Sequence, residues 1–167
     1  MYAPRSATVL LFCLASAAAA DWPQWRGPDR SGRVGAAEFA PAALPPDPKP
    51  IWRLDIGGGF SSPVVAAGKL LYLDTQAGKE VAHLVDAKSG RELWHVAYDE
   101  VYEDEWGPGP RSTPILEDKR AYVQSCRGEF RCLDLADGHV VWGVSFAKDF
   151  GVPFLGCLLY TSDAADE

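Results

Sequence analysis

The chain has 167 residues, of which 47% are apolar and 23% are charged, and its net charge at pH 7 is −7. This composition is typical of a globular protein, because disordered chains contain fewer aromatic and other apolar residues. The acidic balance argues against a nucleic-acid partner, which requires a basic surface. No apolar run is long enough to cross a bilayer, so we expect no membrane span.

Residues 1–20 have the pattern of a secretory signal peptide. Arg5 supplies a positive charge, a short apolar stretch follows, and three alanines precede Asp21. The alternative is a buried N-terminal helix, which the abrupt change to a polar, proline-containing segment disfavours. We expect cleavage after Ala20 and a periplasmic or extracellular location.

Residues 157–167 resemble a translated sequencing adaptor, so we expect this tail to be non-native and not to belong to the fold. The alternative is an ordinary strand followed by an acidic tail. The four cysteines of the chain reduce to Cys126 and Cys132 once both ends are set aside.

A repeat of about fifty residues occupies the region between the two ends. Pro63 and Pro114 are 51 residues apart, and Trp94 and Trp142 are 48 apart. Each unit contains four short apolar runs separated by Gly, Asp or Pro turns, the size of one β-propeller blade. In the second run, Leu71-Tyr72-Leu73 is matched with Ala121-Tyr122-Val123. The predicted fold class is all-β, a β-propeller with four-stranded antiparallel blades.

One motif recurs in register within the two repeats, with an Asp, a Gly and a Trp at four-residue intervals. An Asp carboxylate can accept backbone N–H groups in a tight turn, and a Gly can adopt the positive φ that closes it. The Trp then falls on the outer strand, where its indole can fill the gap between blades and donate its N–H. The predicted structural residues are Asp86, Gly90, Trp94, Asp134, Gly138 and Trp142.

These repeats resemble those of pyrroloquinoline-quinone (PQQ)-like propellers, whose tryptophan-docking motif runs Ala-x-Asp-x-x-x-Gly-x-x-x-Trp. Here Leu84 and Cys132 replace the Ala. The segment Asp21-Trp22-Pro23-Gln24-Trp25-Arg26-Gly27-Pro28 is similar to the mature start of secreted members. The resemblance implies seven or eight blades in an intact protein, of which about two are present.

The resemblance also divides the chain. Residues 21–50 form an irregular, Pro- and Gly-rich extension that wraps over the propeller, and residues 51–156 contain the propeller repeats. Residues 51–56, which include Trp52, resemble an outer strand that belongs to another blade.

No disulfide is expected between Cys126 and Cys132. A two-residue turn at Arg127-Gly128 pairs Cys126 with Glu129 and Val123 with Cys132. Because side chains alternate along a strand, the two sulfurs then lie on opposite faces. We interpret Cys132 as a core residue.

Other candidate ligand groups are given structural roles. Residues 99–105 carry five carboxylates without the spacing of a dedicated calcium loop, and we expect a solvated acidic loop. His83, His95 and His139 show no paired ligand spacing, so we interpret them as strand or turn residues.

Residues 57–59 are three glycines that precede a strand and open no helix, which disfavours a phosphate site. Arg111 precedes an inner strand, from which it either projects into the central channel or stabilises a turn.

Two classes of function fit the resemblance. The first is an exported, non-enzymatic scaffold whose top face or channel binds a protein or small molecule, as in the propeller of outer-membrane protein assembly. The alternative is a PQQ-dependent quinoprotein dehydrogenase acting on alcohols, sugars or polyvinyl alcohol, with PQQ on the propeller axis and Ca²⁺ beside it.

The motifs present specify blades and none specifies a cofactor, which favours the scaffold. Family dehydrogenases often carry a disulfide between adjacent cysteines, a pair that this sequence lacks. We assign no catalytic, cofactor-binding or metal residue and expect no cofactor in this segment; PQQ and calcium remain open for the intact protein.

Overall fold

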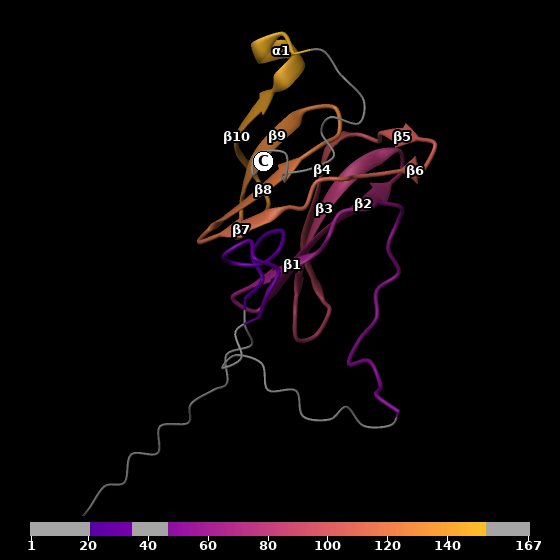
Figure 1. Cartoon of the computed structure of the whole chain (residues 1–167), viewed down its shortest axis with the longest axis vertical. Helices are drawn as coiled ribbons and strands as arrows, with labels where there is room; N and C mark the ends of the chain where they lie inside the picture. Colours follow the sequence, from indigo (N-terminus) through magenta and orange to yellow (C-terminus); the bar gives the residue numbers. More distant parts are fainter. Residues whose placement is uncertain (1–20, 35–46, 153–167) are drawn as a thin grey trace, which may run out of the picture.

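The computed structural model describes residues 21–34 and 47–152. The predicted signal peptide and the predicted adaptor-derived tail lie outside these residues. Two four-stranded antiparallel sheets make up most of the described chain (Figure 1). The predicted all-β fold with four-stranded antiparallel blades is confirmed.

Each sheet is one blade, and its strands follow one another in chain order. The first blade consists of β1 (Val64–Ala66), β2 (Lys69–Gln76), β3 (Lys79–Asp86) and β4 (Glu92–Glu100). The second consists of β7 (Ile115–Glu117), β8 (Arg120–Gln124), β9 (Glu129–Asp134) and β10 (Val140–Ser145). Between them lies a small hairpin of β5 (Glu103–Asp104) and β6 (Gly107–Pro108), and the short helix α1 (Phe146–Phe150) follows β10.

The strands form where the sequence alternates or concentrates apolar residues. β2 buries alternate side chains, as expected for a strand with two different faces. β3 is a central strand and is buried along nearly its whole length. The tight turn between β1 and β2 is formed by Ala67 and Gly68, both at positive φ (48° and 72°), which matches the twist of a two-residue hairpin.

The inner hairpin of each blade consists of its first two strands, β1 and β2 or β7 and β8. The structure aligns these two hairpins one residue away from the predicted match. Val64 pairs with Leu71 in the first blade, and Ile115 pairs with Tyr122 in the second. Equivalent residues are therefore 51 apart, so Leu71 corresponds to Tyr122 and the predicted match to Ala121 is wrong. The repeated Tyr misled the prediction, because β-sheet register depends on the turn rather than on one identical residue.

The outer hairpins, β3–β4 in the first blade and β9–β10 in the second, keep the predicted spacing of 48 residues between equivalent positions. Leu84 lies opposite Trp94, and Cys132 lies opposite Trp142. The spacing between equivalent residues thus falls from 51 in the inner hairpins to 48 in the outer ones. The second blade lacks these three residues in its middle hairpin, β8–β9. There β8 and β9 have five and six residues, whereas β2 and β3 have eight each.

The predicted two-residue turn at Arg127-Gly128 is also wrong. The Ser125 N–H donates to the Glu129 carbonyl at 2.9 Å, which encloses a three-residue loop. The Ser125 hydroxyl accepts the backbone N–H groups of Arg127 and Glu129, and Gly128 supplies a φ of 86°. This side-chain oxygen stabilises the longer loop, so Gln124 faces Phe130.

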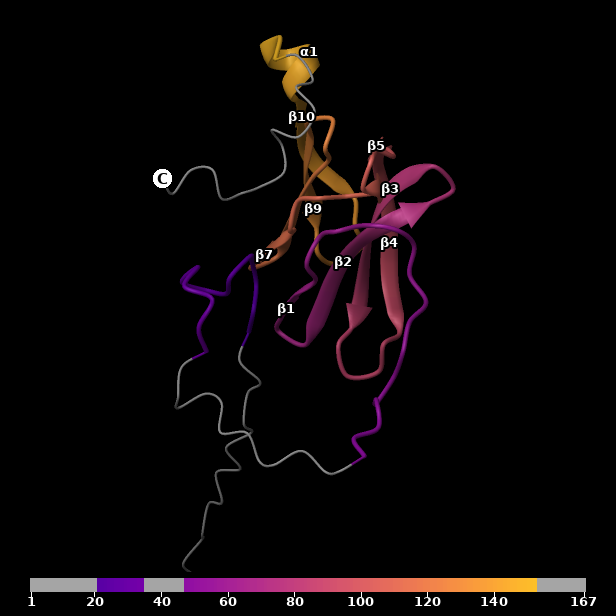
Figure 2. The same cartoon turned by 45° about the vertical axis from the view of Figure 1, so that its right-hand side comes forward.

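The apolar core lies between the two blades, which pack side by side (Figure 2). One face of the first blade contributes aliphatic side chains together with Trp94 and Tyr98, and the facing side of the second blade contributes aliphatic side chains only. Burying these surfaces is the main stabilising contribution to the pair. The core residues are Val64, Leu71, Leu73, Ala82, Leu84, Trp94, Tyr98, Leu116, Ala121, Val123, Leu133 and Leu135.

The described part of the predicted extension joins the inner strands of both blades. Trp22 exchanges two backbone hydrogen bonds with Val65, at 2.6 and 2.9 Å. The carbonyl of Pro23 then accepts the N–H of Leu116 in β7 at 2.8 Å. The opening residues thus bridge β1 and β7, which lie next to each other in Figure 1.

The first of the three glycines at residues 57–59 packs against β2 of the first blade. The N–H of Gly57 donates to Asp74 Oδ2 at 2.8 Å. A Cβ on Gly57 would lie 2.0 Å from the Thr75 carbonyl oxygen, so only glycine fits beside β2.

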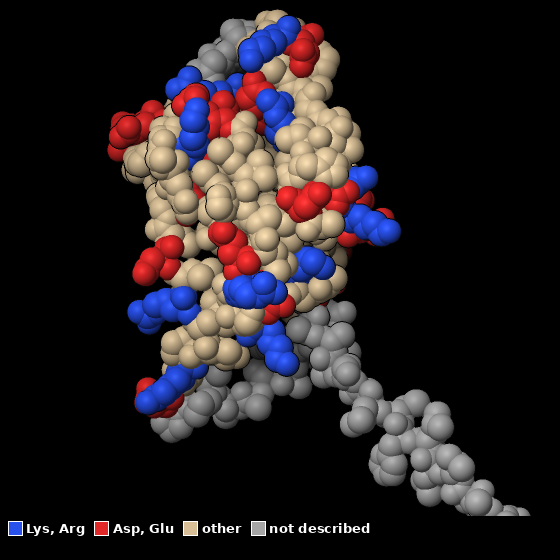
Figure 3. Space-filling model, turned by 180° about the vertical axis from the view of Figure 1, so that it is seen from behind, with Lys and Arg blue, Asp and Glu red and all other residues tan. Residues whose placement is uncertain are grey.

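The charged side chains are of mixed sign. On the face shown in Figure 3, basic and acidic groups alternate over both blades. Among residues 21–34 and 47–152, no helix has the length and apolar character required to cross a bilayer.

Candidate functional site

The Asp–Gly turns of the two blades have the same backbone geometry. The Gly90 N–H donates to the Asp86 carbonyl, and the Gly138 N–H donates to the Asp134 carbonyl, both at 2.8 Å. Both glycines adopt positive φ, 70° and 78°. The carboxylates cap these turns from inside, as the repeated motif predicts.

Different donors hold the two carboxylates. Asp86 accepts the hydroxyl of Ser89 at 2.6 Å and its N–H at 2.8 Å, and these bonds lower the pKa of Asp86. Asp134 accepts the N–H of Ala136 at 2.9 Å, the main reason that its pKa is lowered, and forms an ion pair with Arg120. Both turns are therefore built around an ionised aspartate.

The turn of the second blade receives the indole of Trp94. Its Nε1–H donates to the Leu135 carbonyl at 3.1 Å, and only 8% of the residue is exposed. A Cβ on Gly138 would lie 2.9 Å from the indole ring. Glycine at this position therefore permits both the turn and the close packing of the neighbouring blade's tryptophan.

Trp52 packs on the first blade in the same way. Its Nε1–H donates to the Ala87 carbonyl at 3.0 Å, and a Cβ on Gly90 would lie 2.7 Å from its ring. Ala87 and Leu135 are equivalent, since each follows the aspartate of its turn. Residues 51–56 form no strand in the structure, yet Trp52 occupies the position that an outer-strand tryptophan of a preceding blade would take.

Trp142 has the same place in the second blade but a different environment. It is 45% exposed and lies against the rings of Tyr122 and Phe130, with centroid separations of 6.1 and 5.6 Å. This aromatic face points away from the first blade. The equivalent face of the first blade carries Trp94 and packs against the second blade.

A polar cluster is buried between the blades at the ends of β3 and β4. The Tyr98 hydroxyl donates to Glu80 Oε2 at 3.0 Å, and Glu80 is fully buried. Burial raises the pKa of Glu80 to about 7, although the hydrogen bond from Tyr98 opposes the shift. Across the interface the Ser125 hydroxyl donates to Asp99 Oδ2 at 2.5 Å.

Cys126 and Cys132 are both free and buried, in agreement with the prediction that they do not form a disulfide with each other. Cys126 lies near this polar cluster, and burial, with a smaller contribution from Glu80, raises its pKa to about 12. A thiol with so high a pKa is a poor nucleophile. Cys132 lies in the interior at 1% exposure.

The acidic loop is only partly solvated, so its predicted character needs correction. Asp104 accepts a bond from Arg111 at 2.8 Å, Asp99 is bonded to Ser125, and Glu100 forms an ion pair with Lys79. Each of these carboxylates is engaged with a different partner. Glu103 and Glu105 are exposed as expected.

Arg111 anchors this loop from beneath. Its guanidinium is buried and donates to the carbonyls of Gly109 and Gly107 at 2.9 and 2.7 Å, as well as to Asp104. It also packs over the Phe60 ring at 4.0 Å. Of the two roles predicted for Arg111, the structure shows the turn-stabilising one.

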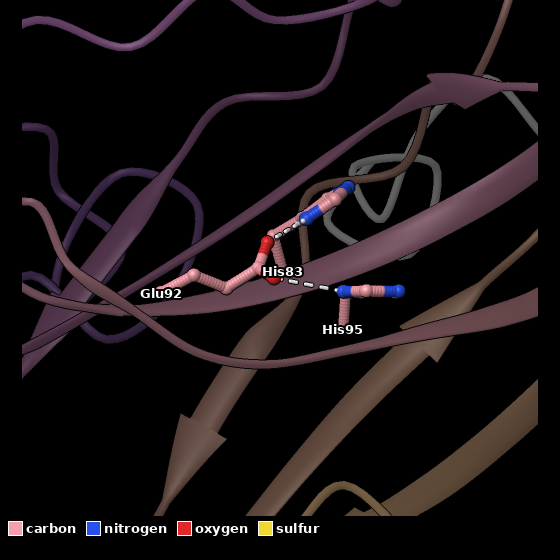
Figure 4. A group of neighbouring side chains, drawn as sticks. All are labelled: His83, Glu92 and His95. Atoms are coloured by element: carbon pink, nitrogen blue, oxygen red, sulfur yellow. Dashed lines mark hydrogen bonds and ion pairs between the residues drawn. The ribbon is translucent and has the colours of Figure 1, made fainter.

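His83 and His95 are strand residues, as predicted, but the fold brings them together with a shared carboxylate. His83 on β3 lies directly opposite His95 on β4, and Glu92 reaches both. Glu92 Oε2 lies 2.8 Å from His83 Nδ1, and Glu92 Oε1 lies 2.8 Å from His95 Nδ1 (Figure 4). These two hydrogen bonds lower the pKa of Glu92.

A sequence signal for this cluster existed. The motif predicts a hairpin that ends at Trp94, and placing Leu84 opposite Trp94 also places His83 opposite His95. Spacing along the chain alone could not reveal the pair, because ligands from neighbouring strands are distant in sequence. His139 is different, since it contacts only Asp137 in its own turn among the ion pairs of the described residues.

Residues 42–151 match the family model PQQ_2, described as outer membrane protein assembly factor BamB. The match covers 110 of the 167 residues, both blades included. The chain belongs to the PQQ_2 family. The predicted PQQ-like repeat propeller is thereby confirmed.

Solved structures with a similar fold include two types of PQQ_2-like propeller. BamB from Moraxella catarrhalis is 18% identical, with a TM-score of 0.36 over 55% of this chain and 23% of that one. Quinohemoprotein alcohol dehydrogenase from Comamonas testosteroni is 20% identical, with a TM-score of 0.47 over 81% of this chain and 21% of that one. The chain thus spans less than a quarter of either protein. No curated protein sequence matches it.

The carboxylates of residues 99–105 do not converge as the ligands of a calcium site would. A Ca²⁺ ion requires six to eight oxygen ligands around one point. The carboxylates of residues 99–105 instead form separate pairs with Arg111, Ser125 and Lys79. These separately paired carboxylates do not fit a Ca²⁺ ion.

Proposed function

We propose that the complete protein is an exported, non-enzymatic PQQ_2 propeller that binds a protein partner through its top-face loops. The observation that carries this proposal is the exposed aromatic group on a firmly held loop. Trp106 is 68% exposed on the turn between β5 and β6, and Phe60 beside this hairpin is 53% exposed.

The loop has the character of a protein-binding surface. Arg111 fixes the loop backbone from below through two carbonyls and Asp104, which reduces the ordering cost of binding. Exposed aromatic side chains with polar neighbours are typical of interaction hot spots. Glu103 and Glu105 add negative charge, so we expect a partner surface that combines an apolar pocket with basic residues.

Site-specific photo-cross-linking in the complete protein tests the partner. A cross-linking residue at position 106 should yield one defined protein adduct in the cell envelope. The same residue at Ile51, which is 91% exposed and distant from the hairpin in sequence, is the matched control and should yield none. Equal labelling from both positions, or none from position 106, would contradict the proposed surface.

The dehydrogenase alternative is tested on the same protein. We expect neither quinone absorbance nor dye-linked alcohol oxidation after incubation with PQQ and Ca²⁺, because the blade motifs stabilise packing without a ligand. Alcohol turnover that a chelator abolishes would establish a quinoprotein dehydrogenase instead.

Export through residues 1–20 belongs to the same proposal. Mass spectrometry of the protein from the producing cell should find Asp21 as the first residue. A chain that retains Met1 inside the cell would contradict export.

A further inference from the structure

The strongest unassigned chemistry in the described chain is the group of His83, Glu92 and His95. The ligand atoms of these residues lie within 4.8 Å of one another. The two Nδ1 atoms and the Glu92 carboxylate point toward a common space beside β3 and β4 (Figure 4). Two imidazoles and one carboxylate are a ligand set that Zn²⁺ uses, with bonds of about 2 Å.

A buried carboxylate supports the inner histidine. His83 is 2% exposed, and its Nε2 lies 3.0 Å from Oδ1 of the equally buried Asp74. The Gly57 N–H holds the other oxygen of Asp74 at 2.8 Å. Asp74 thus orients the imidazole so that Nδ1 faces Glu92, which is the second-sphere pattern of metal-binding histidines.

The charge of the group also calls for a cation. Asp74 and Glu92 lie on either side of one imidazole, and no Lys or Arg is among their ion-pair partners in the described part of the chain. A divalent cation bound to Glu92 would offset this negative charge.

The second blade shows that the repeat fold does not require this group. The positions 48 residues later are Arg131, Val140 and Gly143, and Arg131 lies opposite Gly143. A Cβ on Gly143 would lie 2.6 Å from the Arg131 guanidinium. The second blade thus places its own cation, paired with Glu129, where the first blade has imidazoles.

We propose that His83 Nδ1, His95 Nδ1 and the Glu92 carboxylate form a Zn²⁺ site on the first blade. Asp74 is the positioning residue, since it orients His83 without touching the metal. Three protein ligands leave one position of a tetrahedral zinc ion open to water or to a ligand from a binding partner. Zn²⁺ binds unprotonated Nδ1 atoms, so binding releases any proton that they carry.

Isothermal titration of the metal-free chain with Zn²⁺ tests the proposal. We expect one zinc ion per chain, and an affinity at least about tenfold lower for Glu92→Gln and His95→Asn. Both side chains are partly exposed, 44% and 60%, so neither change should unfold the blade. Asp74→Asn should weaken binding by about 10- to 100-fold through loss of orientation.

His139→Asn provides a matched control. His139 is also 60% exposed and bonded to a carboxylate through Nδ1, but it has no second imidazole. The His139→Asn variant should bind zinc as the unaltered chain does, and zinc should raise the melting temperatures of both proteins equally. A melting temperature that zinc fails to raise, or zinc affinities of Glu92→Gln and His95→Asn equal to that of His139→Asn, would overturn the proposal.

Discussion

Trp94 and Trp142 hold the same position in two copies of one motif, but only Trp94 is packed in a blade interface. Trp94 is 8% exposed and is bonded to Leu135, whereas Trp142 is 45% exposed and touches only aromatic neighbours of its own blade among its ring contacts. The motif by itself therefore forms a turn but not a blade interface. The turn becomes an interface when the tryptophan of the preceding blade packs on its glycine.

The largest expected effect comes from removing the docked indole. Trp94→Ala should lower the free energy of unfolding by about 3–5 kcal/mol, the range for a buried aromatic residue. Trp142→Ala in the same chain should cost less than about 1 kcal/mol, because this residue is half exposed. Urea denaturation of both variants measures the contrast. Equal losses would show that the two environments do not differ in energy.

Glu80 gives the first blade a pH-dependent contribution to stability. The pKa of Glu80 rises from its usual 4.5 to about 7 on folding, so the folded state holds the proton more tightly. Its contribution to stability is complete below pH 4.5 and is lost as the pH rises through about 7. The total is at most about 3 kcal/mol.

Glu80→Gln should remove this part of the pH dependence while keeping a hydrogen-bonding group beside Tyr98. Thermal melts of the two proteins between pH 4.5 and 8 give the difference directly. Parallel curves would mean that Glu80 is ionised at all these values in the fold.

Ser125 tests the loop that distinguishes the middle hairpins. Ser125→Ala removes the bond to Asp99 and the acceptor for two backbone N–H groups. We expect a loss of about 1–3 kcal/mol in the free energy of unfolding, since buried polar groups lose their partner. Ser61→Ala is the control and should change stability less, because the Ser61 hydroxyl is buried but has no hydrogen-bond partner among the described residues.

Alternation and turn residues are local signals, and they predicted the two four-stranded sheets and the Asp–Gly turns, whereas residues 51–56 do not form the predicted outer strand. The loop after Gln124 was missed because a serine hydroxyl, rather than a turn dipeptide, decides its length. The pairing of His83 with His95 and the burial of Glu80 depend on cross-strand and cross-blade neighbours. Such neighbours follow only from a correct register.

Glycine at position 138 offers the most direct test that a docked tryptophan joins the blades. Gly138 and Gly78 have nearly the same φ, 78° and 76°, but only a Cβ at position 138 would meet the Trp94 indole, at 2.9 Å. A Cβ at position 78 meets nothing within 4 Å. Gly78→Ala therefore measures backbone strain alone, while Gly138→Ala measures strain together with disturbed docking.

The decisive measurement is a double-mutant cycle between Gly138→Ala and Trp94→Ala by urea denaturation, with Gly78→Ala as reference. Gly138→Ala should cost more than Gly78→Ala in the unaltered chain, and most of this excess should disappear once Trp94 is alanine. The expected coupling is about 0.5–3 kcal/mol. Strictly additive losses, with the same excess in both backgrounds, would contradict docking of Trp94 on the second blade.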